Sequence, residues 1–267
     1  MPWWQWPHAA SSWLPRSWRN SIVRNPRVFV DLALAADSEL RLPEAPSNHL
    51  LRVLRLRPGA PLTLFNGRGG EYQAELLGAD QRSARVRIDA QRAIERESPL
   101  QLTLLQAISR GERMDLVMQK ATELGVTRIV PVNSEFGVVR LDASQAQRKR
   151  EHWQSIVISA CEQSGRNRVP EVTAIVDLDA AVQAQADAAG RLLLAPGGTV
   201  TLAAQAAGLR AATLLIGAEG GLSERELQLA AQHGFVACRL GPRILRTETA
   251  PLAAIALLQA LAGDLAL

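Results

Sequence analysis

The segment Gly217-Ala218-Glu219-Gly220-Gly221 combines glycines with a single carboxylate. It follows an apolar run, residues 213–216, and precedes Ser223, where a helical pattern begins. Glycine lets main-chain N–H groups approach a ligand closely, and open α/β sheets bind ligands at the turns that follow their strands. The pattern predicts either a ligand-binding loop or a tight strand-to-helix turn. It is neither a G-x-G-x-x-G motif nor a phosphate-binding P-loop, because no Gly-Lys-Ser/Thr is present.

A second segment, Leu240–Ala250, joins Arg243 and Arg246 to Thr247-Glu248-Thr249 at the expected start of the last helix. Gly241-Pro242 forces a turn ahead of them. Capping of the helix would require only one of the two threonines, Thr247 or Thr249. Capping does not explain the two arginines, which leaves them as candidate functional groups.

The elements that position these segments alternate from residue 99 onward between short apolar runs and helical patterns. Ser223 and Glu226 form a capping box that starts one helix, and Gly125 ends another. Strands that alternate with helices predict an α/β domain with a mainly parallel sheet. The expected strands are 102–107, 128–132, 172–175, 191–194, 213–216 and 238–240, and the expected helices are 114–124, a long one through 153–161, 223–233 and 249–262.

Residues 22–92 are expected to form a separate small β domain, a compact barrel of short strands. Asn66–Gly70 is typical of a hairpin loop, and Ser47 is expected to cap a short helix. In residues 82–88, Arg85 and Arg87 alternate with Val86 and Ile88, which predicts a half-buried strand with a basic face. Residues 92–98 are expected to be a linker. The tryptophan-rich residues 1–21 are expected to lie outside the fold, or alternatively to form a docking arm.

Composition excludes several classes of protein. The 267 residues are 47% hydrophobic and 21% charged, which is typical of globular chains. Cys161 and Cys238 are too few for a disulfide framework and share no metal-ligand spacing, so neither disulfides nor a metal site is expected. No run approaches the length of a membrane span, and the expected location is the cytoplasm. The net charge of +4 arises in residues 1–100, which hold 14 Arg and 10 acidic residues, and this asymmetry suggests a nucleic-acid partner.

Several of these segments together resemble a known family, the bacterial 16S rRNA (uracil-N3)-methyltransferases of the SPOUT class. The similar segments are Gly217–Gly221, Leu240–Ala250, Gln119–Val126, Ala160–Pro170, and, for a PUA-like N-terminal domain, His49–Arg55 with the Asn66-Gly67 hairpin. The resemblance implies a PUA-like RNA-binding β-barrel over residues 22–92 and a trefoil-knotted methyltransferase domain over 99–267. It also implies a homodimer that binds S-adenosylmethionine and methylates N3 of one uridine in the 16S rRNA of the small ribosomal subunit. Ala218 departs from the family, which usually has proline there.

The resemblance also suggests which residues act. The uracil N3–H is a weak acid, so a carboxylate could take the proton while an arginine holds the negative charge. The catalytic candidates are Arg246, Glu219 and Glu248, with Arg166 as a further one. The predicted cofactor pocket is formed mainly by main chain of Leu194, Ile216, Gly217, Gly220, Gly221, Leu240, Gly241, Ile244, Leu245 and Thr247. The predicted RNA contacts are Arg24, Arg27, Arg52, Arg55, Arg166 and Arg168.

Two other classes of protein are alternatives to the methyltransferase interpretation, and the sequence also predicts a dimer interface. A non-catalytic RNA-binding assembly factor would explain the basic N-terminal part but not the two late loops. A Rossmann-type methyltransferase would need a glycine-rich loop after the first strand of its domain, where Ile108–Gly111 offers one glycine. The apolar dimer interface is expected on the helix bearing Trp153, Ile156, Val157, Ala160 and Cys161 and on the helix 249–262.

Overall fold

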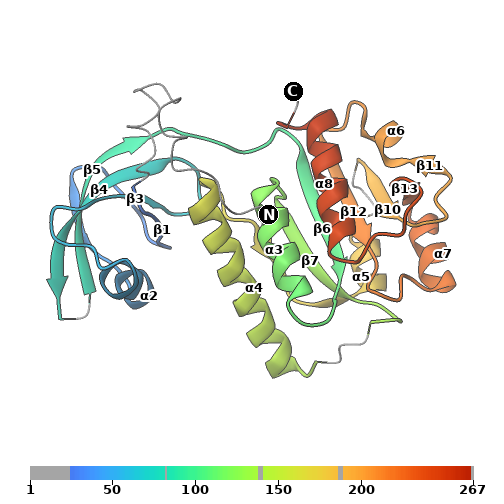
Figure 1. Cartoon of the computed structure of the whole chain (residues 1–267), viewed down its shortest axis with the longest axis horizontal. Helices are drawn as coiled ribbons and strands as arrows, with labels where there is room; N and C mark the ends of the chain where they lie inside the picture. The colour runs from blue at the N-terminus through green and yellow to red at the C-terminus, as the bar shows by residue number, and fades with distance from the viewer. Residues whose placement is uncertain (1–24, 82, 138–140, 186–188, 266–267) are drawn as a thin grey trace, which may run out of the picture. The chain divides into compact units, whose positions relative to one another are not determined.

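The computed structural model describes residues 25–81, 83–137, 141–185 and 189–265 (Figure 1). The predicted extension 1–21 and the predicted RNA contact Arg24 lie outside the described residues. The chain divides into two compact units. Of the described residues, the first unit contains 25–30, Leu34–Leu64 and Tyr72–Gln91, and the second contains Asp31–Ala33, Phe65–Glu71 and the chain from Arg92 onward.

The first unit is built on a five-stranded sheet in the order β1-β3-β4-β5-β2. Its long strand β5 buries every second side chain, so Val86 and Ile88 face the core while Arg85 and Arg87 face solvent, as the alternation predicts. The β3–β4 hairpin forms around the predicted glycine-bearing loop. The strands are β1 Arg27–Phe29, β2 Ser38–Arg41, β3 Pro61–Phe65, β4 Glu71–Asp80 and β5 Ser83–Arg92.

The predicted role of Ser47 as a helix cap is wrong. Ser47 lies inside helix α2 (Glu44–Asn48), which continues into a short π-helical segment, η2 (His49–Val53). The Ser47 side chain is buried, and its Oγ donates to the Leu42 carbonyl (3.0 Å) and accepts from the Ala84 N–H (2.9 Å). The hydroxyl therefore fastens the helix to β5, a tertiary bond that a local capping pattern does not reveal.

The second unit contains an eight-stranded parallel sheet in the order β11-β13-β10-β12-β6-β7-β8, with β9 also paired to β7. Because every recorded pair is parallel, the carboxyl ends of the strands meet at one edge. The strands are β6 Gln101–Ala107, β7 Arg128–Asn133, β8 Glu171–Val172, β9 Val176–Asp177, β10 Arg191–Leu194, β11 Val200–Thr201, β12 Ala211–Ile216 and β13 Val236–Arg239.

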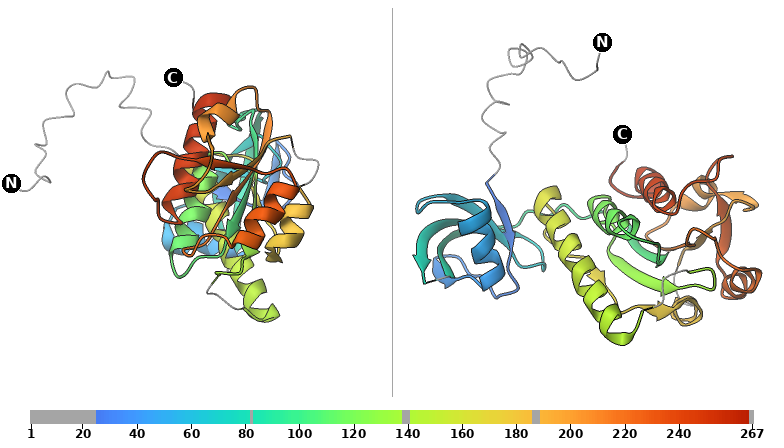
Figure 2. Two further views of the ribbon diagram at one scale, coloured as in Figure 1. Left: turned by 90° about the vertical axis from the view of Figure 1, so that its right-hand side faces the viewer. Right: turned by 60° about the horizontal axis from the view of Figure 1, so that its bottom comes forward.

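Helices cover both faces of this sheet (Figure 2). Neighbouring side chains of one strand separate accordingly, so Leu104 packs into one core and Leu105 into the other. The first face holds α3 (Arg113–Glu123), α4 (Ala143–Ser164), α6 (Leu202–Ala206) and α8 (Thr249–Ala262), and the second holds α5 (Leu178–Gln183) and α7 (Glu224–Gln232). The predicted mainly parallel α/β domain is confirmed, as is the Ser223–Glu226 capping box that starts α7.

The predicted dimer stripe on α4 is wrong, and one face of α8 also turns inward. Trp153 and Val157 of α4 and Ile255 and Leu258 of α8 are buried in the core of their own chain. The indole N–H of Trp153 donates to Asp115 Oδ1 (3.2 Å) on α3, which anchors it there. Ala160 and Cys161 are buried too, and Ile156 packs against the same core. The helical spacing therefore marked core-facing stripes, the commoner reason for an apolar face.

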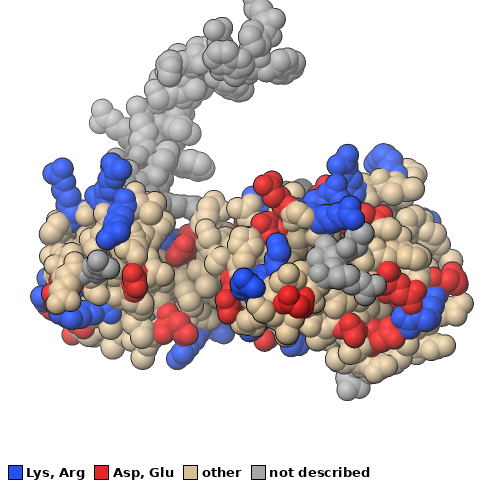
Figure 3. Space-filling view, turned by 90° about the horizontal axis from the view of Figure 1, so that it is seen from below, with Lys and Arg blue, Asp and Glu red and all other residues tan. Residues whose placement is uncertain are grey.

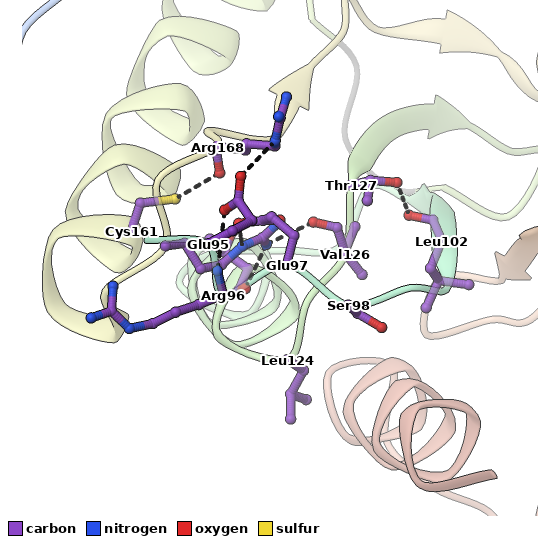
Figure 4. Close-up of polar contacts among 12 residues, drawn as sticks. Glu95, Arg96, Glu97, Ser98, Leu102, Leu124, Val126, Thr127, Cys161 and Arg168 are labelled. Atoms are coloured by element: carbon purple, nitrogen blue, oxygen red, sulfur yellow. Dashed lines mark hydrogen bonds and ion pairs between the residues drawn. The ribbon is translucent and has the colours of Figure 1, made fainter. Parts of the chain in front are cut away.

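The predicted linker is held firmly against the loop that follows α4 (Figure 4). The Asn167 side chain donates to the Ile94 carbonyl (2.7 Å), and Arg168 Nε donates to Glu95 Oε2 (3.0 Å). Arg96 Nη1 donates to the Gly165 carbonyl (2.9 Å). Successive residues of the segment thus bind successive residues of one loop, so this part of the chain is not a free tether.

Candidate active site

Turns after neighbouring parallel strands enclose a cavity of about 650 Å³ at the carboxyl edge of the sheet. The turn after β12, the loop between β13 and α8, and the turn after β10 all line it. The lining includes every predicted cofactor residue, namely Leu194, Ile216, Gly217, Gly220, Gly221, Leu240, Gly241, Ile244, Leu245 and Thr247, together with Arg246, Glu219 and Glu248. The structure thus brings together three segments that are far apart in the sequence.

The turn after β12 leaves no room for side chains. A Cβ atom at Gly217 would lie 2.9 Å from the Gly221 carbonyl carbon, and one at Gly220 would lie 2.9 Å from Phe136 Cβ. Gly221 has a φ of 73°, in the region that favours glycine, and its N–H donates to the Ala218 carbonyl (2.9 Å). The tight turn therefore forms with alanine at position 218, and it exposes main chain to the cavity.

Thr247 connects the last loop to this turn. Its hydroxyl donates to the Gly217 carbonyl (3.0 Å) and accepts from Gln106 Nε2 of β6 (3.5 Å). The helix α8 begins at Thr249 after Glu248, and no side chain caps it. The alternative in which Thr247 or Thr249 caps this helix is therefore wrong, because no side chain caps it and the Thr247 hydroxyl is used in a tertiary contact.

Glu219 is the most constrained charged group of the cavity. Its Oε1 accepts from the Arg110 N–H (3.1 Å) and from Arg113 Nη1 (2.5 Å). Burial alone would raise the pKa of this carboxyl, but hydrogen bonds from the N–H groups of Glu219 and Arg110 and from Arg113 outweigh burial. The pKa of Glu219 therefore lies below its ordinary value, and the group is ionised at neutral pH.

Glu248 and Arg246 differ from Glu219 in their surroundings. Arg113 Nε lies 3.8 Å from Glu248 Oε2, which is an ion pair without a hydrogen bond. Among the described residues nothing donates to that buried oxygen, so Glu248 keeps an acceptor site open. Arg246 is exposed at the cavity wall. The site therefore offers two carboxylates and a cation beside main-chain donors and acceptors.

Arg110 and Arg113 were missed as site residues by the sequence reasoning. Arg110 lies in the turn between β6 and α3, and Arg113 is the first residue of α3. Strand β6 is the neighbour of β12, with Gln106 paired to Ile216. Because the segments that follow adjacent parallel strands lie close together, two arginines shortly after a buried strand could have been recognised in the sequence as candidate site residues. With Gly111, Glu112 and Glu219 they line a second cavity of about 530 Å³.

The residues predicted to contact RNA differ in how exposed they are and in what they bind. Arg166 is buried, forms an ion pair with Glu97, and donates through Nη1 to the Thr122 and Val126 carbonyls (2.8 Å each). Arg166 is therefore wrong both as an RNA contact and as a catalytic candidate, because its guanidinium is consumed inside the fold. Arg168 pairs with Glu95 at the surface. In the first unit, Arg52 and Arg55 are exposed, whereas Arg27 is half-buried.

The described part of the chain contains no cluster of His, Cys, Asp and Glu suited to a metal ion, and both cysteines in it are buried and unpaired with each other. Among the described helices, none is both long and apolar enough to cross a bilayer.

The second unit combines a parallel α/β sheet with a main-chain-lined cavity at its carboxyl edge, beside carboxylates and arginines, which is the arrangement of a ligand-binding domain. Comparison with known families gives its class, an RNA methyltransferase. The RNA methyltransferase domain family matches residues 96–259, and the RNA methyltransferase PUA domain family matches residues 42–89. Both matches agree with the order of the two units.

Similar proteins extend over nearly the whole chain. Ribosomal RNA small subunit methyltransferase E of Buchnera aphidicola is 34% identical over 91% of this chain and 98% of its own, and the Bacillus subtilis protein of the same name is 31% identical over 86% and 94%. A methyltransferase of Legionella pneumophila, solved with bound cofactor SAM, is 40% identical with a TM-score of 0.87, covering 91% of this chain and all of its own (100%). The Neisseria gonorrhoeae methyltransferase E, bound to S-adenosyl methionine, is 42% identical with a TM-score of 0.83, covering 90% and 99%. The chain belongs to the ribosomal RNA small subunit methyltransferase E family.

Proposed function

We propose that this protein transfers a methyl group from S-adenosylmethionine to N3 of one uridine in 16S rRNA of the small ribosomal subunit. Membership of the methyltransferase E family and two similar structures with the bound cofactor support the proposal. The observation that carries it is the main-chain-lined cavity that adjoins the Glu219–Arg113–Glu248 cluster, because it pairs a cofactor-sized site with groups able to move a proton.

The residues around the larger cavity fit the cofactor. A volume of about 650 Å³ lies within the usual range for small-molecule sites. The apolar side chains of Leu194, Leu240 and Ile244 suit the adenine ring, and the main chain of the 217–221 turn, which lines the cavity, suits its polar edge and the amino-acid part. Glu219 and Glu248 place negative charge where a sulfonium cation is favoured. When bound, S-adenosylmethionine supplies an electrophilic methyl group.

The chain's own residues handle the proton and the charge. The uracil N3–H gives its proton to a carboxylate, Glu219 or Glu248, and the electron pair left on N3 forms the new bond to the methyl carbon. The pair of the broken carbon–sulfur bond stays on sulfur. Arg246 at the cavity wall stabilises the negative charge that develops on the uracil ring.

The first unit contributes RNA binding through exposed arginines. Arg52 and Arg55 lie at and just after η2, and we assign them, with Arg24 and Arg27, to contacts with phosphates, which position RNA without reading its sequence. Arg168 of the second unit is a further candidate. On the face drawn in Figure 3, basic side chains are mixed with acidic ones, so binding there depends on particular arginines rather than on a field of one sign.

The finer features of the family are part of the same proposal. We assign a PUA-like barrel to residues 22–92, a trefoil-knotted methyltransferase domain to residues 99–267, a homodimeric state and a cytoplasmic location. The Thr247–Gly217 bond supports the knot, since it holds the last loop against the turn after β12. No charged residue occurs in α8, and its outer face, which includes the half-exposed Leu261, suits a second copy of the chain.

Two measurements test the proposal. Calorimetry on the purified protein should register binding of S-adenosylmethionine, which the assembly-factor alternative does not expect. Mass spectrometry should then show that 16S rRNA from a deletion strain lacks one N3-methyluridine. Incubation of small subunits from that strain with the purified protein and S-adenosylmethionine should restore it. Cofactor binding without any restored methyl group would refute the assignment of the substrate.

A further inference from the structure

We infer that the second cavity, lined by Arg110, Gly111, Glu112, Arg113 and Glu219, receives the uracil base and distinguishes it from cytosine. The inference rests on the proposed function. The cavity measures about 530 Å³, which is ample for a single base. A base that is modified at a ring nitrogen must leave the stack and enter such a pocket.

The two cavities are contiguous. Arg113 and Glu219 line both of them, so a base in the second cavity meets the contents of the first across these two side chains. Glu219 Oε1 accepts from the Arg110 N–H (3.1 Å) and from Arg113 Nη1 (2.5 Å), which fixes the carboxylate at the boundary. A ring nitrogen that faces Glu219 therefore lies at the boundary between the two cavities.

The chemistry of the lining matches the Watson–Crick edge of uracil. That edge presents an acceptor, a donor and an acceptor, namely O2, N3–H and O4. The second cavity is lined by the guanidinium donors of Arg110 and Arg113 and by two carboxylates, Glu112 and Glu219, of which only Glu219 also lines the first cavity. Uracil can thus donate N3–H to Glu219 while its carbonyls accept from the arginines.

Cytosine is rejected by the same arrangement. Its N3 is an acceptor and its N4 amino group is a donor, so N3 would face a carboxylate and N4 would face a guanidinium. Before any transfer from the base, Glu219 is ionised at neutral pH because its hydrogen bonds lower its pKa, so it has no proton to donate to cytosine N3. Two repulsive contacts replace two attractive ones, which is how a polar site discriminates strongly between bases of similar shape.

Gly111 keeps the cavity open. Its φ is 62°, and a Cβ atom there would meet no other atom within 4 Å, so the main chain borders free space. Glu112 ends this turn as the residue before the first turn of α3. The turn therefore presents charged side chains around a gap rather than packing onto a neighbour.

The test compares binding of small subunits that carry uridine or cytidine at the acceptor position, with S-adenosylhomocysteine present so that no methyl group is transferred. The wild-type protein should bind uridine subunits about tenfold more tightly than cytidine subunits, which corresponds to the free energy of one charge-assisted hydrogen bond. Arg110→Ala, which lines only the second cavity, should reduce this ratio and leave cofactor affinity unchanged. Glu219→Gln should reduce or invert the ratio, because the amide N–H can donate to cytosine N3.

Arg128→Ala is the matched control. Arg128 stands at the start of β7 and pairs with Glu171, away from the carboxyl edge of the sheet, and its loss should leave the ratio unchanged. If Arg110→Ala weakens binding of uridine and cytidine subunits equally and reduces the salt dependence of that binding, Arg110 is a phosphate contact and the inference is overturned. A ratio near one for the wild-type protein would overturn it as well. In a parallel assay with S-adenosylmethionine in place of S-adenosylhomocysteine, the wild-type protein should methylate the uridine subunits. If it methylates neither kind of subunit, the proposed function fails, whereas methylation of uridine subunits with a binding ratio near one overturns the inference alone.

Discussion

Replacing Arg166 by alanine is expected to destabilise the second unit by about 3–5 kcal/mol, the usual cost of removing one partner from a buried ion pair. The side chains of Arg166 and Glu97 are 5% and 12% exposed, so the carboxylate of Glu97 would be left in a site that water reaches poorly. The Val126 carbonyl would lose its guanidinium donor, whereas the Thr122 carbonyl would keep the N–H of Gly125 (3.0 Å). The loss is thus dominated by the stranded charge.

Urea denaturation followed by circular dichroism measures this effect. The midpoint should fall with little change in slope, because the unfolded surface is the same. In thermal unfolding, about 2–4 °C per kcal/mol for a unit of this size corresponds to a decrease of about 6–20 °C in Tm. Small-subunit affinity, measured well below the transition, should remain that of the wild-type protein.

Arg168→Ala supplies the matched control. Its pair with Glu95 is exposed, with side-chain exposures of 59% and 40%, so its loss should cost less than about 1 kcal/mol. An Arg166→Ala protein that is as stable as Arg168→Ala but binds small subunits more weakly would refute the reasoning, and would restore Arg166 as an RNA contact.

Three further outcomes are expected. Gly220→Val should abolish S-adenosylmethionine binding in calorimetry, because its side chain collides with Phe136, whereas Gly197→Ala, which meets no atom within 4 Å, should bind normally; equal affinities would contradict this. Methylation should decline at low pH only as Glu219 becomes protonated, below its ordinary pKa, and Arg113→Gln should move this decline to higher pH by removing one cause of the lowered pKa. A pH–rate profile that does not shift would exclude Glu219 as the proton acceptor. Joint replacement of Arg52 and Arg55 by alanine should weaken small-subunit binding and flatten its salt dependence with unchanged cofactor affinity, whereas Arg85→Ala/Arg87→Ala, whose charges are paired with Glu39, Glu75 and Asp89, should have the smaller effect. Reduced cofactor affinity in the first double variant would contradict the separation of RNA binding from chemistry.

The parts of the fold that could be predicted are those governed by local rules or by one repeated pattern. The Ser223–Glu226 capping box needs only neighbours in sequence, and the alternation of strand and helix implies a parallel sheet whatever the strand order. The residues predicted to bind the cofactor line one cavity for a related reason. Turns after parallel strands converge at one edge, so glycines and chemical groups that follow strands are brought together automatically.

The errors share a different cause, since each depended on a partner distant in sequence. Ser47 and Thr247 carry hydroxyls suited to capping, but Ala84 and Gly217 engage them instead. Arg166 carries the positive charge expected of an RNA contact, but its side chain is buried in an ion pair with Glu97, which lies 69 residues earlier in the sequence. Which side chain meets which strand or loop is decided by three-dimensional packing that periodicity does not encode.

The order of strands in the second unit also determines when its core can close during synthesis. Strand β6 pairs on one side with β12. The pairing partner of Gln101 is Ala211, which is synthesised 110 residues later. At about 5–20 residues per second, the ribosome needs roughly 5–20 s to deliver that partner. During this interval one edge of a strand with the sequence Gln101-Leu-Thr-Leu-Leu-Gln-Ala107 has no β12 to cover it. The nascent chain is therefore exposed to aggregation for longer than a protein whose strands pair with their sequence neighbours.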